Sequence, residues 1–168
     1  MKYFVCSDIH RRTDNFRKAL SEAVSSDLGG VVIAGDLEVS TSEINDIVYS
    51  VCGKICNPKL YMVKGNCDYN DIGLENEITF RLPGGINCML THGHKYNVKM
   101  NRDILSYAAS SKECQVVIYG HTHNYDDSFV GPVRMINPGC ICGGYFGDGG
   151  YIIMDVDDGI INTKHKLL

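Results

Sequence analysis

The sequence predicts an α/β protein in which mixed sheets stack on one another and helices lie outside. In the first half, short apolar runs alternate with amphipathic stretches, which indicates a βαβαβ order. The second half contains one more helical stretch and is rich in hairpin signals. The length of 168 residues suits one compact domain, and no linker, repeat or low-complexity tract divides it. We therefore expect a single domain over residues 1–168.

The first half is expected to contain three strands and two helices. The strands are predicted over Lys2–Cys6, Gly30–Ala34 and Lys59–Val63. One helix is predicted over Thr13–Ser26, where Thr13 or Asp14 can cap its amino end. The apolar stripe of this helix consists of Phe16, Leu20, Ala23 and Val24. The other helix is predicted over Ser42–Cys52, with an apolar face formed by Ile44, Ile47, Val48 and Val51.

The second half begins with a predicted hairpin. Its strands, Glu77–Leu82 and Ile86–Thr91, flank the turn at Pro83-Gly84-Gly85. A third helix is predicted over Asn101–Ser111, and Gln115–Tyr119 reads as another buried strand. The remaining strands are expected to be mostly antiparallel, and they cover Ser128–Val130, Val133–Ile136, Tyr151–Val156 and Ile160–Lys166, with a turn at Asp157-Asp158-Gly159 between the last two.

The composition limits the classes of partner. A net charge of -4 argues against a general nucleic-acid-binding protein, which would present a basic face. It is compatible with a phosphate substrate, because bound metal ions would reverse the local sign. The longest apolar runs are too short to span a bilayer. The first residues lack the length and the cleavage site of a signal peptide, so we expect a cytoplasmic protein with no membrane association.

Eight cysteines in a chain without a signal peptide favour reduced thiols over a disulfide framework. The pairs Cys52-x3-Cys56 and Cys140-x-Cys142 lack the spacing of zinc knuckles, and the other four cysteines stand alone. We interpret most of them as small buried hydrophobic residues.

Polar side chains follow five of the predicted strands, at the point where each strand ends. The segments are Ser7-Asp8-Ile9-His10, Gly35-Asp36, Gly65-Asn66-Cys67-Asp68, Thr91-His92-Gly93-His94 and Gly120-His121-Thr122-His123. Open α/β sheets bind ligands beyond the carboxyl ends of their strands. A single His or Asp there is usually a turn residue or a satisfied polar group. Here five of the six histidines occupy such positions, and only His165 does not, so we predict one shared site.

The donor types in these segments predict a pair of metal ions. Carboxylate oxygen, amide oxygen and imidazole nitrogen suit Mn, Fe, Zn, Ni or Co rather than Cu(I) or a cluster. Two Asp, one Asn and four His are too many for one tetrahedral ion and enough for two ions that share a bridge. Two ions about 3.5–4 Å apart can hold a hydroxide between them and stabilise the attacking and leaving oxygens at phosphorus. The charge of two divalent ions exceeds that of Asp8, Asp36 and the hydroxide, which favours phosphate binding.

The five segments, together with Asn137-Pro138-Gly139, resemble the calcineurin-like metallophosphoesterase superfamily in their order and spacing. The likeness extends from Met1 to about Tyr145. It is greatest to the small single-domain branch, the YfcE-type phosphodiesterases, and to the retromer subunit that shares their fold. The resemblance implies a four-layer α-β-β-α sandwich, a two-metal site and a possible homodimer.

The resemblance also implies a role for each matched position. Asp8, His10 and His123 match ligands of the first metal, and Asp36 matches the bridging ligand. The ligands of the second metal correspond to Asn66, His92 and His121, and Asn66 can also touch a substrate oxygen. His94 is not carried over as a ligand, and we expect it to orient a residue that binds metal. Mn is the favoured ion, with Ni, Zn, Fe or Co as alternatives.

Three positions depart from the pattern of the superfamily. Cys67 stands where larger members have a His that assists the leaving group, although the small branch often has Cys there. Because a neutral thiol is a poor general acid, we expect good leaving groups or diesters to react best; alternatively, Cys67 only fills space. Arg11 replaces a frequent Gly, and either Arg11 or Arg12 grips a phosphate oxygen or both are solvated. Cys140 replaces a usual Ser, and the residues after it, Gly143–Gly150, either cover the site or form a surface loop.

The expected function is metal-dependent hydrolysis of a phosphate ester of a small molecule, with a phosphodiester favoured over a monoester. The alternative is a non-catalytic protein-interaction scaffold that keeps the fold and binds metal, and a third reading is a structural zinc protein. A competent donor fills every one of the seven ligand positions, which favours the enzyme. No segment of the sequence identifies the substrate.

Overall fold

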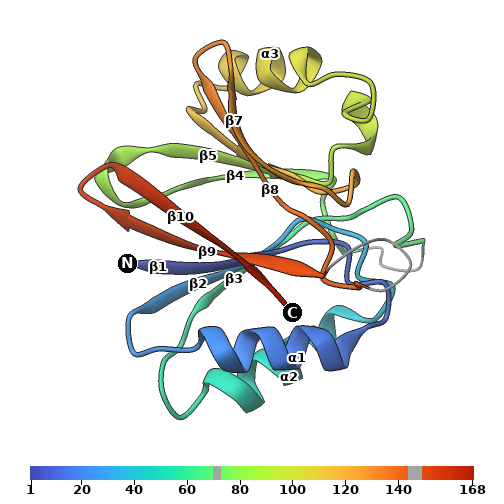
Figure 1. Cartoon of the computed structure of the whole chain (residues 1–168), viewed down its shortest axis with the longest axis vertical. Coiled ribbons are helices and arrows are strands. Elements are labelled where there is room, and N and C mark those ends of the chain that lie inside the picture. The colour runs from blue at the N-terminus through green and yellow to red at the C-terminus, as the bar shows by residue number, and fades with distance from the viewer. Residues whose placement is uncertain (70–72, 144–148) are drawn as a thin grey trace.

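The computed structural model describes residues 1–69, 73–143 and 149–168. Two five-stranded sheets stack face to face, and helices cover both outer faces (Figure 1). Helices α1 (Thr13–Ala23) and α2 (Thr41–Cys52) lie against one sheet, and α3 (Asp103–Ser111) lies against the other. The predicted α/β sandwich of two mixed sheets flanked by helices is confirmed.

The first sheet has the strand order β10-β9-β1-β2-β3. Its strands are β1 (Lys2–Cys6), β2 (Leu28–Ile33), β3 (Lys59–Met62), β9 (Gly150–Asp157) and β10 (Ile160–Leu167). β1, β2 and β3 run parallel, whereas β9 is antiparallel to both β1 and β10. The predicted strands are therefore confirmed, with ends that differ by one or two residues.

The second sheet has the strand order β4-β5-β6-β8-β7. Its strands are β4 (Glu77–Arg81), β5 (Asn87–Thr91), β6 (Val116–Ile118), β7 (Tyr125–Val130) and β8 (Val133–Pro138). The predicted hairpin of β4 and β5 is confirmed, and the short 3-10 helix η1 (Pro83–Gly85) joins them. β5, β6 and β8 run parallel, so the contact of β8 with β6 is the parallel exception among the mostly antiparallel pairings that were expected for the last strands.

The ends of the helices depart from the prediction most clearly at α1, whereas α2 begins at Thr41 rather than Ser42 and α3 at Asp103 rather than Asn101. Neither Thr13 nor Asp14 caps α1, because the N-cap residue is Arg12 and no side chain accepts a capping hydrogen bond. The helix ends at Ala23 rather than Ser26, because Val24 takes an extended conformation. A second short 3-10 helix, η2, covers His94–Tyr96. No helix in the described ranges has the length and apolar character that a membrane crossing requires.

Apolar side chains fill each of the three gaps between layers. The layer between the two sheets contains Val5, Val32, Leu90, Ile118 and Ile136. A second cluster joins the first sheet to α1 and α2, and a third joins the second sheet to α3. Burial of these side chains, at about 1.5–3 kcal/mol each, holds the layers in a fixed order.

A polar network also joins the two sheets. Arg134 on β8 forms a two-pronged ion pair with Asp127 on β7, with Nε–Oδ1 at 2.8 Å and Nη2–Oδ2 at 2.9 Å. The same guanidinium donates from Nη1 to the carbonyl oxygen of Ile161 on β10 at 2.7 Å. Thr163 on β10 donates its hydroxyl to Asp127. Burial raises the pKa of Asp127, but Arg134 and Thr163 outweigh burial and hold that pKa below its usual value.

We expect Arg134→Met to lower the free energy of unfolding by about 1–3 kcal/mol, because it leaves the largely buried Asp127 carboxylate without its partner. The depressed pKa of Asp127 means that the ion pair stabilises the fold above about pH 4 and that this contribution is lost as the pH falls further. Urea unfolding monitored by circular dichroism at several pH values measures both effects. Arg81→Met, at an exposed position of β4, is the control and should change stability little. An equal loss for both variants would contradict the role of the network.

Candidate metal centre

The loops at the carboxyl ends of five strands meet at one edge of the stacked sheets. β1, β2 and β3 are parallel in one sheet and β5 and β6 are parallel in the other, so their carboxyl ends point to the same side. The Oδ1 atom of Asp8 lies 3.1 Å from Nε2 of His123, and Oδ2 of Asp36 lies 3.2 Å from Nε2 of His92. These two contacts join the first sheet to the second at the cluster.

Asp8 is fully buried, and its two carboxylate oxygens have different surroundings. Oδ2 accepts hydrogen bonds from the Ser7 hydroxyl at 2.5 Å and from the His121 amide at 3.1 Å. Oδ1 has no hydrogen-bond partner in the structure. Around Oδ1 lie Nε2 of His123 at 3.1 Å, of His10 at 3.8 Å and of His92 at 4.0 Å. A buried anionic oxygen that faces imidazole nitrogens is suited to a cation.

Asp36 is the second buried carboxylate of the cluster. Its Oδ1 atom accepts from the Cys67 amide at 2.7 Å, and its Oδ2 atom lies 3.2 Å from Nε2 of His92 and 3.8 Å from Nε2 of His10. Burial raises the pKa of Asp36, but the hydrogen bond and charge of His92 outweigh it and keep the pKa far below the usual range. Asp36 is therefore a carboxylate at neutral pH.

The outer nitrogens of two histidines are fixed by hydrogen bonds. Nδ1 of the buried His92 donates to the carbonyl oxygen of Ala34 at 2.7 Å, so its Nε2 faces Asp36 and Oδ1 of Asn66, the latter at 3.1 Å. Nδ1 of His10 lies 2.6 Å from Oε1 of Glu38. Burial lowers the pKa of His92, but Asp36 and Asp8 outweigh burial, so the pKa of His92 lies above its usual value. Metal-binding histidines usually have such a carbonyl or carboxylate partner on the second nitrogen.

The remaining predicted residues lie around this centre. The Nε2 atoms of His10 and His123 are 3.4 Å apart, and the rings of His92 and His121 lie 5.1 Å apart. Burial and the neighbouring His92 lower the pKa of His121 to about 4, which keeps this imidazole neutral. The structure thus brings together the predicted seven, Asp8, His10, Asp36, Asn66, His92, His121 and His123.

His94 lies at the edge of the cluster rather than within it. Its ring is 5.4 Å from that of His92 and 6.2 Å from that of His121. Its Nδ1 atom is buried and has no hydrogen-bond partner in the structure. Burial and the charge of His92 lower its pKa. We expected His94 to orient a metal-binding residue. Among the described residues no hydrogen bond from the His94 ring does so, and His92 is instead oriented by Ala34.

Cys67 and Asp68 connect the loop after β3 to the loop after β2. Besides its amide bond to Asp36, Cys67 accepts at its sulfur from Nδ2 of Asn66 at 3.2 Å. Burial, followed by the charge of Asp36, raises the pKa of the Cys67 thiol to about 12, so the thiol is neutral as expected. The buried Asp68 accepts from the amides of Glu38 and Gly65, both at 2.8 Å.

The backbone is left-handed at five of the seven predicted ligand positions. The φ angles are 54° at Asp8, 46° at His10, 53° at Asp36, 68° at His121 and 61° at His123. This conformation costs roughly 1–2 kcal/mol for a residue other than glycine. Such conformations cluster at functional sites, where the surrounding structure holds them in place. Each of these left-handed turns points a donor side chain inward at the end of a strand, which accounts for the unfavourable conformation.

Two glycines allow the loops to approach the carboxylates closely. A Cβ atom at Gly65 would lie 2.1 Å from Oδ1 of Asp36, and one at Gly120 would lie 2.8 Å from Oδ2 of Asp8. Neither contact is sterically possible without movement. The glycines beside the predicted ligands therefore serve the packing of the cluster as well as the turns.

A cleft of about 330 Å³ opens beside the cluster. It is lined by Arg11, Glu38, Val39, Ser40, Thr41, Cys67, Asp68 and Tyr69. The Arg11 side chain is 76% exposed, and its Nε lies 3.3 Å from Oε2 of Glu38. The reading of Gly143–Gly150 as a cover for the site falls largely outside the described residues.

The prediction of reduced thiols is wrong for Cys140 and Cys142, which form a disulfide. Their Cα atoms are 5.3 Å apart, a separation that a disulfide spans readily. The turn between them brings the two sulfurs together. The spacing of zinc knuckles does not reveal such a pairing. The other six cysteines are free, and four of these are buried: Cys6, Cys52, Cys88 and Cys114.

The sequence reading missed two residues that support the cluster. The Ser7 hydroxyl lies between two acceptors, 2.5 Å from Oδ2 of Asp8 and 2.7 Å from the carbonyl oxygen of Gly139, and Glu38 holds His10. Their only signal in the sequence is their position within two residues of a predicted ligand. Both hold predicted ligands by hydrogen bonds, which a pattern of donor types does not reveal.

The donors present fit divalent metal ions. Groups of side chains with ligand atoms within 4.8 Å of one another are Asp8–His10–His123, Asp8–Asp36–His92 and His10–Asp36–Cys67. The first two combine carboxylate and imidazole, the donors that suit Mn, Zn, Fe, Co and Ni. The buried Oδ1 atom of Asp8, which has no hydrogen-bond partner among the described residues, is suited to such an ion. An α/β sandwich with these donors at its strand ends has the architecture of the metallophosphoesterase class.

Comparisons of sequence identify the family. The model of the calcineurin-like phosphoesterase superfamily domain matches residues 1–159. Phosphodiesterase MJ0936 of Methanocaldococcus jannaschii is 30% identical over 178 residues, which cover 99% of this chain and 95% of that protein. The probable metallophosphoesterase YsnB of Bacillus subtilis is 26% identical over 142 residues, covering 84% and 75%. The chain belongs to the calcineurin-like phosphoesterase superfamily.

Solved structures agree with this assignment. A protein described as a novel archaeal phosphodiesterase has a TM-score of 0.78 and 27% identity, and the match covers 100% of both chains. Vps29 of Entamoeba histolytica in complex with Zn²⁺ has a TM-score of 0.74 and 20% identity, and the match covers 99% of both chains. The second similarity demonstrates the shared fold alone. The family of this chain implies divalent metal ions.

We expect Gly65→Ala to displace Asp36, because the new methyl group would lie 2.1 Å from its carboxylate. The free energy of unfolding should fall by about 1–3 kcal/mol, as in other overpacked interiors. The rise in melting temperature on adding Mn²⁺ should also become smaller. Gly131→Ala is the control for the metal response: its left-handed φ of 58° makes an alanine costly, but no atom lies within 4 Å of the added methyl group, so the Mn²⁺-induced rise should be unchanged. Calorimetry with and without Mn²⁺ measures both effects. If the Mn²⁺-induced rise in melting temperature is unchanged in Gly65→Ala, the close approach of Gly65 to Asp36 is contradicted.

Proposed function

We propose that this protein is a metal-dependent phosphodiesterase that binds two divalent ions. In this proposal Asp8, His10 and His123 hold one ion, and Asn66, His92 and His121 hold the other. Asp36 lies between the two groups, with Oδ2 within 3.8 Å of both His10 and His92, and serves as the bridge. Mn²⁺ is the favoured ion in this proposal, and the same donors also suit Ni²⁺, Zn²⁺, Fe or Co.

The observation that carries the proposal is the state of His92. Its Nδ1–H is committed to the carbonyl oxygen of Ala34, so Nε2 is the nitrogen that faces Asp36 and Asn66. Lone pairs that face a carboxylate and an amide oxygen repel unless a proton or a metal ion lies between them. Nε2 of His10, whose Nδ1 is held by Glu38, faces Asp8 and Asp36 in the same way. A proton would satisfy one such contact, but two together favour metal ions.

When bound, two divalent ions supply a hydroxide nucleophile and stabilise the leaving oxygen. The residues of the chain bind and orient the reactants. Nδ2 of Asn66 donates to Cys67, and in this proposal it donates to a non-bridging phosphate oxygen instead when substrate binds. The cleft beside Cys67 gives room for one arm of a diester, and the exposed guanidinium of Arg11 at its edge can pair with an anionic group of the substrate.

The phosphodiesterase names of the relatives support this choice over a monoesterase. MJ0936, which covers almost the whole chain, is called a phosphodiesterase, and so is the archaeal structure with the same fold. The neutral Cys67 thiol agrees, because it is a poor acid for protonating a basic alkoxide. The substrate is expected to be a small molecule in this proposal.

The alternative is a protein-interaction scaffold that binds metal. The similarity of the fold to Vps29 favours this alternative. Uptake of two ions per chain without turnover of any diester with Mn²⁺, Ni²⁺ or Zn²⁺ would support the scaffold. Hydrolysis that depends on these ions would support the enzyme.

Hydrolysis of a nitrophenyl phosphodiester should require added Mn²⁺ and should cease on chelation, while circular dichroism shows that the fold remains. Asp36→Asn should lower kcat/KM by about 100-fold or more, because the loss of even an outer-shell partner costs up to about that amount. Asp46→Asn, on the exposed face of α2, is the control and should keep full activity. Activity without metal, or an active Asp36→Asn, would disprove the proposed centre.

A second prediction concerns the neutral thiol of Cys67. We expect Cys67→His to increase hydrolysis of an alkyl ester, whose leaving group needs a proton, while a nitrophenyl ester gains little. The increase should be about 10²-fold or more if the imidazole reaches the leaving oxygen. Cys67→Ser is the matched variant without a general acid. If the ratio of the two substrates is the same in all three proteins, Cys67 only fills space.

A further inference from the structure

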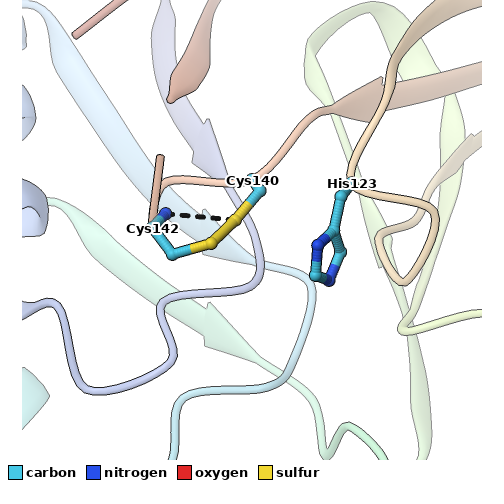
Figure 2. Close-up of side chains that lie close together, drawn as sticks. All are labelled: His123, Cys140 and Cys142. Carbon is cyan, nitrogen blue, oxygen red and sulfur yellow. Dashed lines mark hydrogen bonds between the residues drawn. A yellow bond between two sulfur atoms is a disulfide. The ribbon is translucent and has the colours of Figure 1, made fainter. Parts of the chain in front are cut away.

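A second group of possible metal ligands lies next to the proposed centre. Figure 2 shows the imidazole ring of His123 beside the sulfur atoms of Cys140 and Cys142. One ligand atom from each of the three residues lies within 4.8 Å of the others. We propose that the reduced form of Cys140 and Cys142, together with His123, binds a thiophilic divalent ion of the Zn²⁺ and Cd²⁺ type. This inference does not depend on the proposed phosphodiesterase activity.

The chemistry of the donors separates this site from the neighbouring one. Two thiolates and one imidazole select soft or borderline ions, whereas carboxylates and imidazoles also suit Mn²⁺. Cys140 and Cys142 are almost completely buried, with exposed fractions of 2% and 5%. Two thiolates neutralise one divalent ion, so the loaded site would carry no net charge into a buried place. A fourth position remains for water or another donor, as in other sites with three protein ligands.

The backbone that carries the two cysteines is held in place on both sides. The Ile141 amide donates to the carbonyl oxygen of Ser7 at 3.0 Å, and the Ile141 side chain is fully buried in the core beside α1. Nδ2 of Asn15 donates to the carbonyl oxygens of Ile141 at 3.1 Å and Cys142 at 3.2 Å. The pair of sulfurs therefore occupies a rigid turn, which lowers the entropy lost when a metal ion binds.

Polar groups already surround the sulfur of Cys140. The Cys142 amide donates to it at 3.2 Å, drawn as the dashed line in Figure 2. The carbonyl oxygen of Asp8 lies 3.3 Å from the same sulfur. An amide that donates to sulfur stabilises a thiolate over a thiol. Such N–H···S hydrogen bonds are typical partners of metal-bound thiolates.

The redox state decides whether the site exists. In the structure, Cys140 and Cys142 form a disulfide and offer no thiolate. A thiol reductant transfers two electrons and two protons to this disulfide, breaks the S–S bond and becomes a disulfide itself. Binding of the ion then releases the two thiol protons, while His123 binds as the neutral ring. Oxidation therefore removes the site, and reduction creates it.

Sharing of His123 links the two sites. Nε2 of His123 lies 3.1 Å from Oδ1 of Asp8, within the proposed centre, while the same ring faces the sulfurs. A soft ion at the cysteine pair would bind the imidazole of His123, which the proposed centre also uses as a ligand. Its binding should therefore alter the affinity of the centre for Mn²⁺.

The test is a titration with Cd²⁺, followed by the ultraviolet charge-transfer band of thiolate-bound cadmium. The reduced protein should develop this band, and the oxidised protein should lack most of it. Cys140→Ser/Cys142→Ser should lose the band to the same extent, and His123→Ala should weaken Cd²⁺ binding by at least about tenfold. The comparison of reduced with oxidised wild type needs no substitution, so it remains decisive if a variant fails to fold.

Two further variants exclude other thiols. Cys67 lies in the proposed centre, and Cys52 and Cys56 form another neighbouring pair at the end of α2. Cys67→Ser and Cys52→Ser/Cys56→Ser should keep most of the band. A band that survives in Cys140→Ser/Cys142→Ser, or that is equal in oxidised and reduced protein, would overturn the proposed site. An affinity for Cd²⁺ that is unchanged in His123→Ala would do the same.

Discussion

The burial of two carboxylates, Asp8 and Asp36, is the constraint on which the rest of the site depends. A buried carboxylate costs several kcal/mol unless a cation or hydrogen-bond donors compensate it. Amides and a hydroxyl satisfy one oxygen of each residue, and imidazole nitrogens alone face the other. The left-handed turns and the close glycines hold the carboxylates and imidazoles in this arrangement. Its charge is balanced best by divalent ions.

The two sheets supply different donor residues to the proposed centre. The first sheet supplies the carboxylates and Asn66, and the second sheet supplies three of the four histidines among the seven clustered residues. Neither sheet alone offers both donor types in sufficient number, so the site forms only when the sheets stack. The apolar layer between them and the network of Arg134 therefore contribute to function by fixing the relative position of the two sheets.

Much of this arrangement could be predicted because the relevant signals are local. An apolar run followed by Gly and a donor marks a strand end, and parallel pairing then places the donors together. The cap of α1 was predicted wrongly because capping depends on backbone geometry at Arg12, and residue type does not reveal it. The disulfide of Cys140 and Cys142 and the support of His10 by Glu38 depend on distances across turns and between loops. Residue spacing alone does not determine those distances.

Metal binding alone does not separate a hydrolase from a scaffold, because both readings of this site include bound ions. The shape beside the centre is more informative. A cleft of about 330 Å³ lies in the size range of small-molecule pockets, and it begins at Cys67, whose amide holds Asp36. A protein partner would instead need a surface of about 800 Å² on this chain. A small concave site that reaches Cys67, next to the carboxylate of Asp36, therefore favours a small ligand over a protein partner at this face.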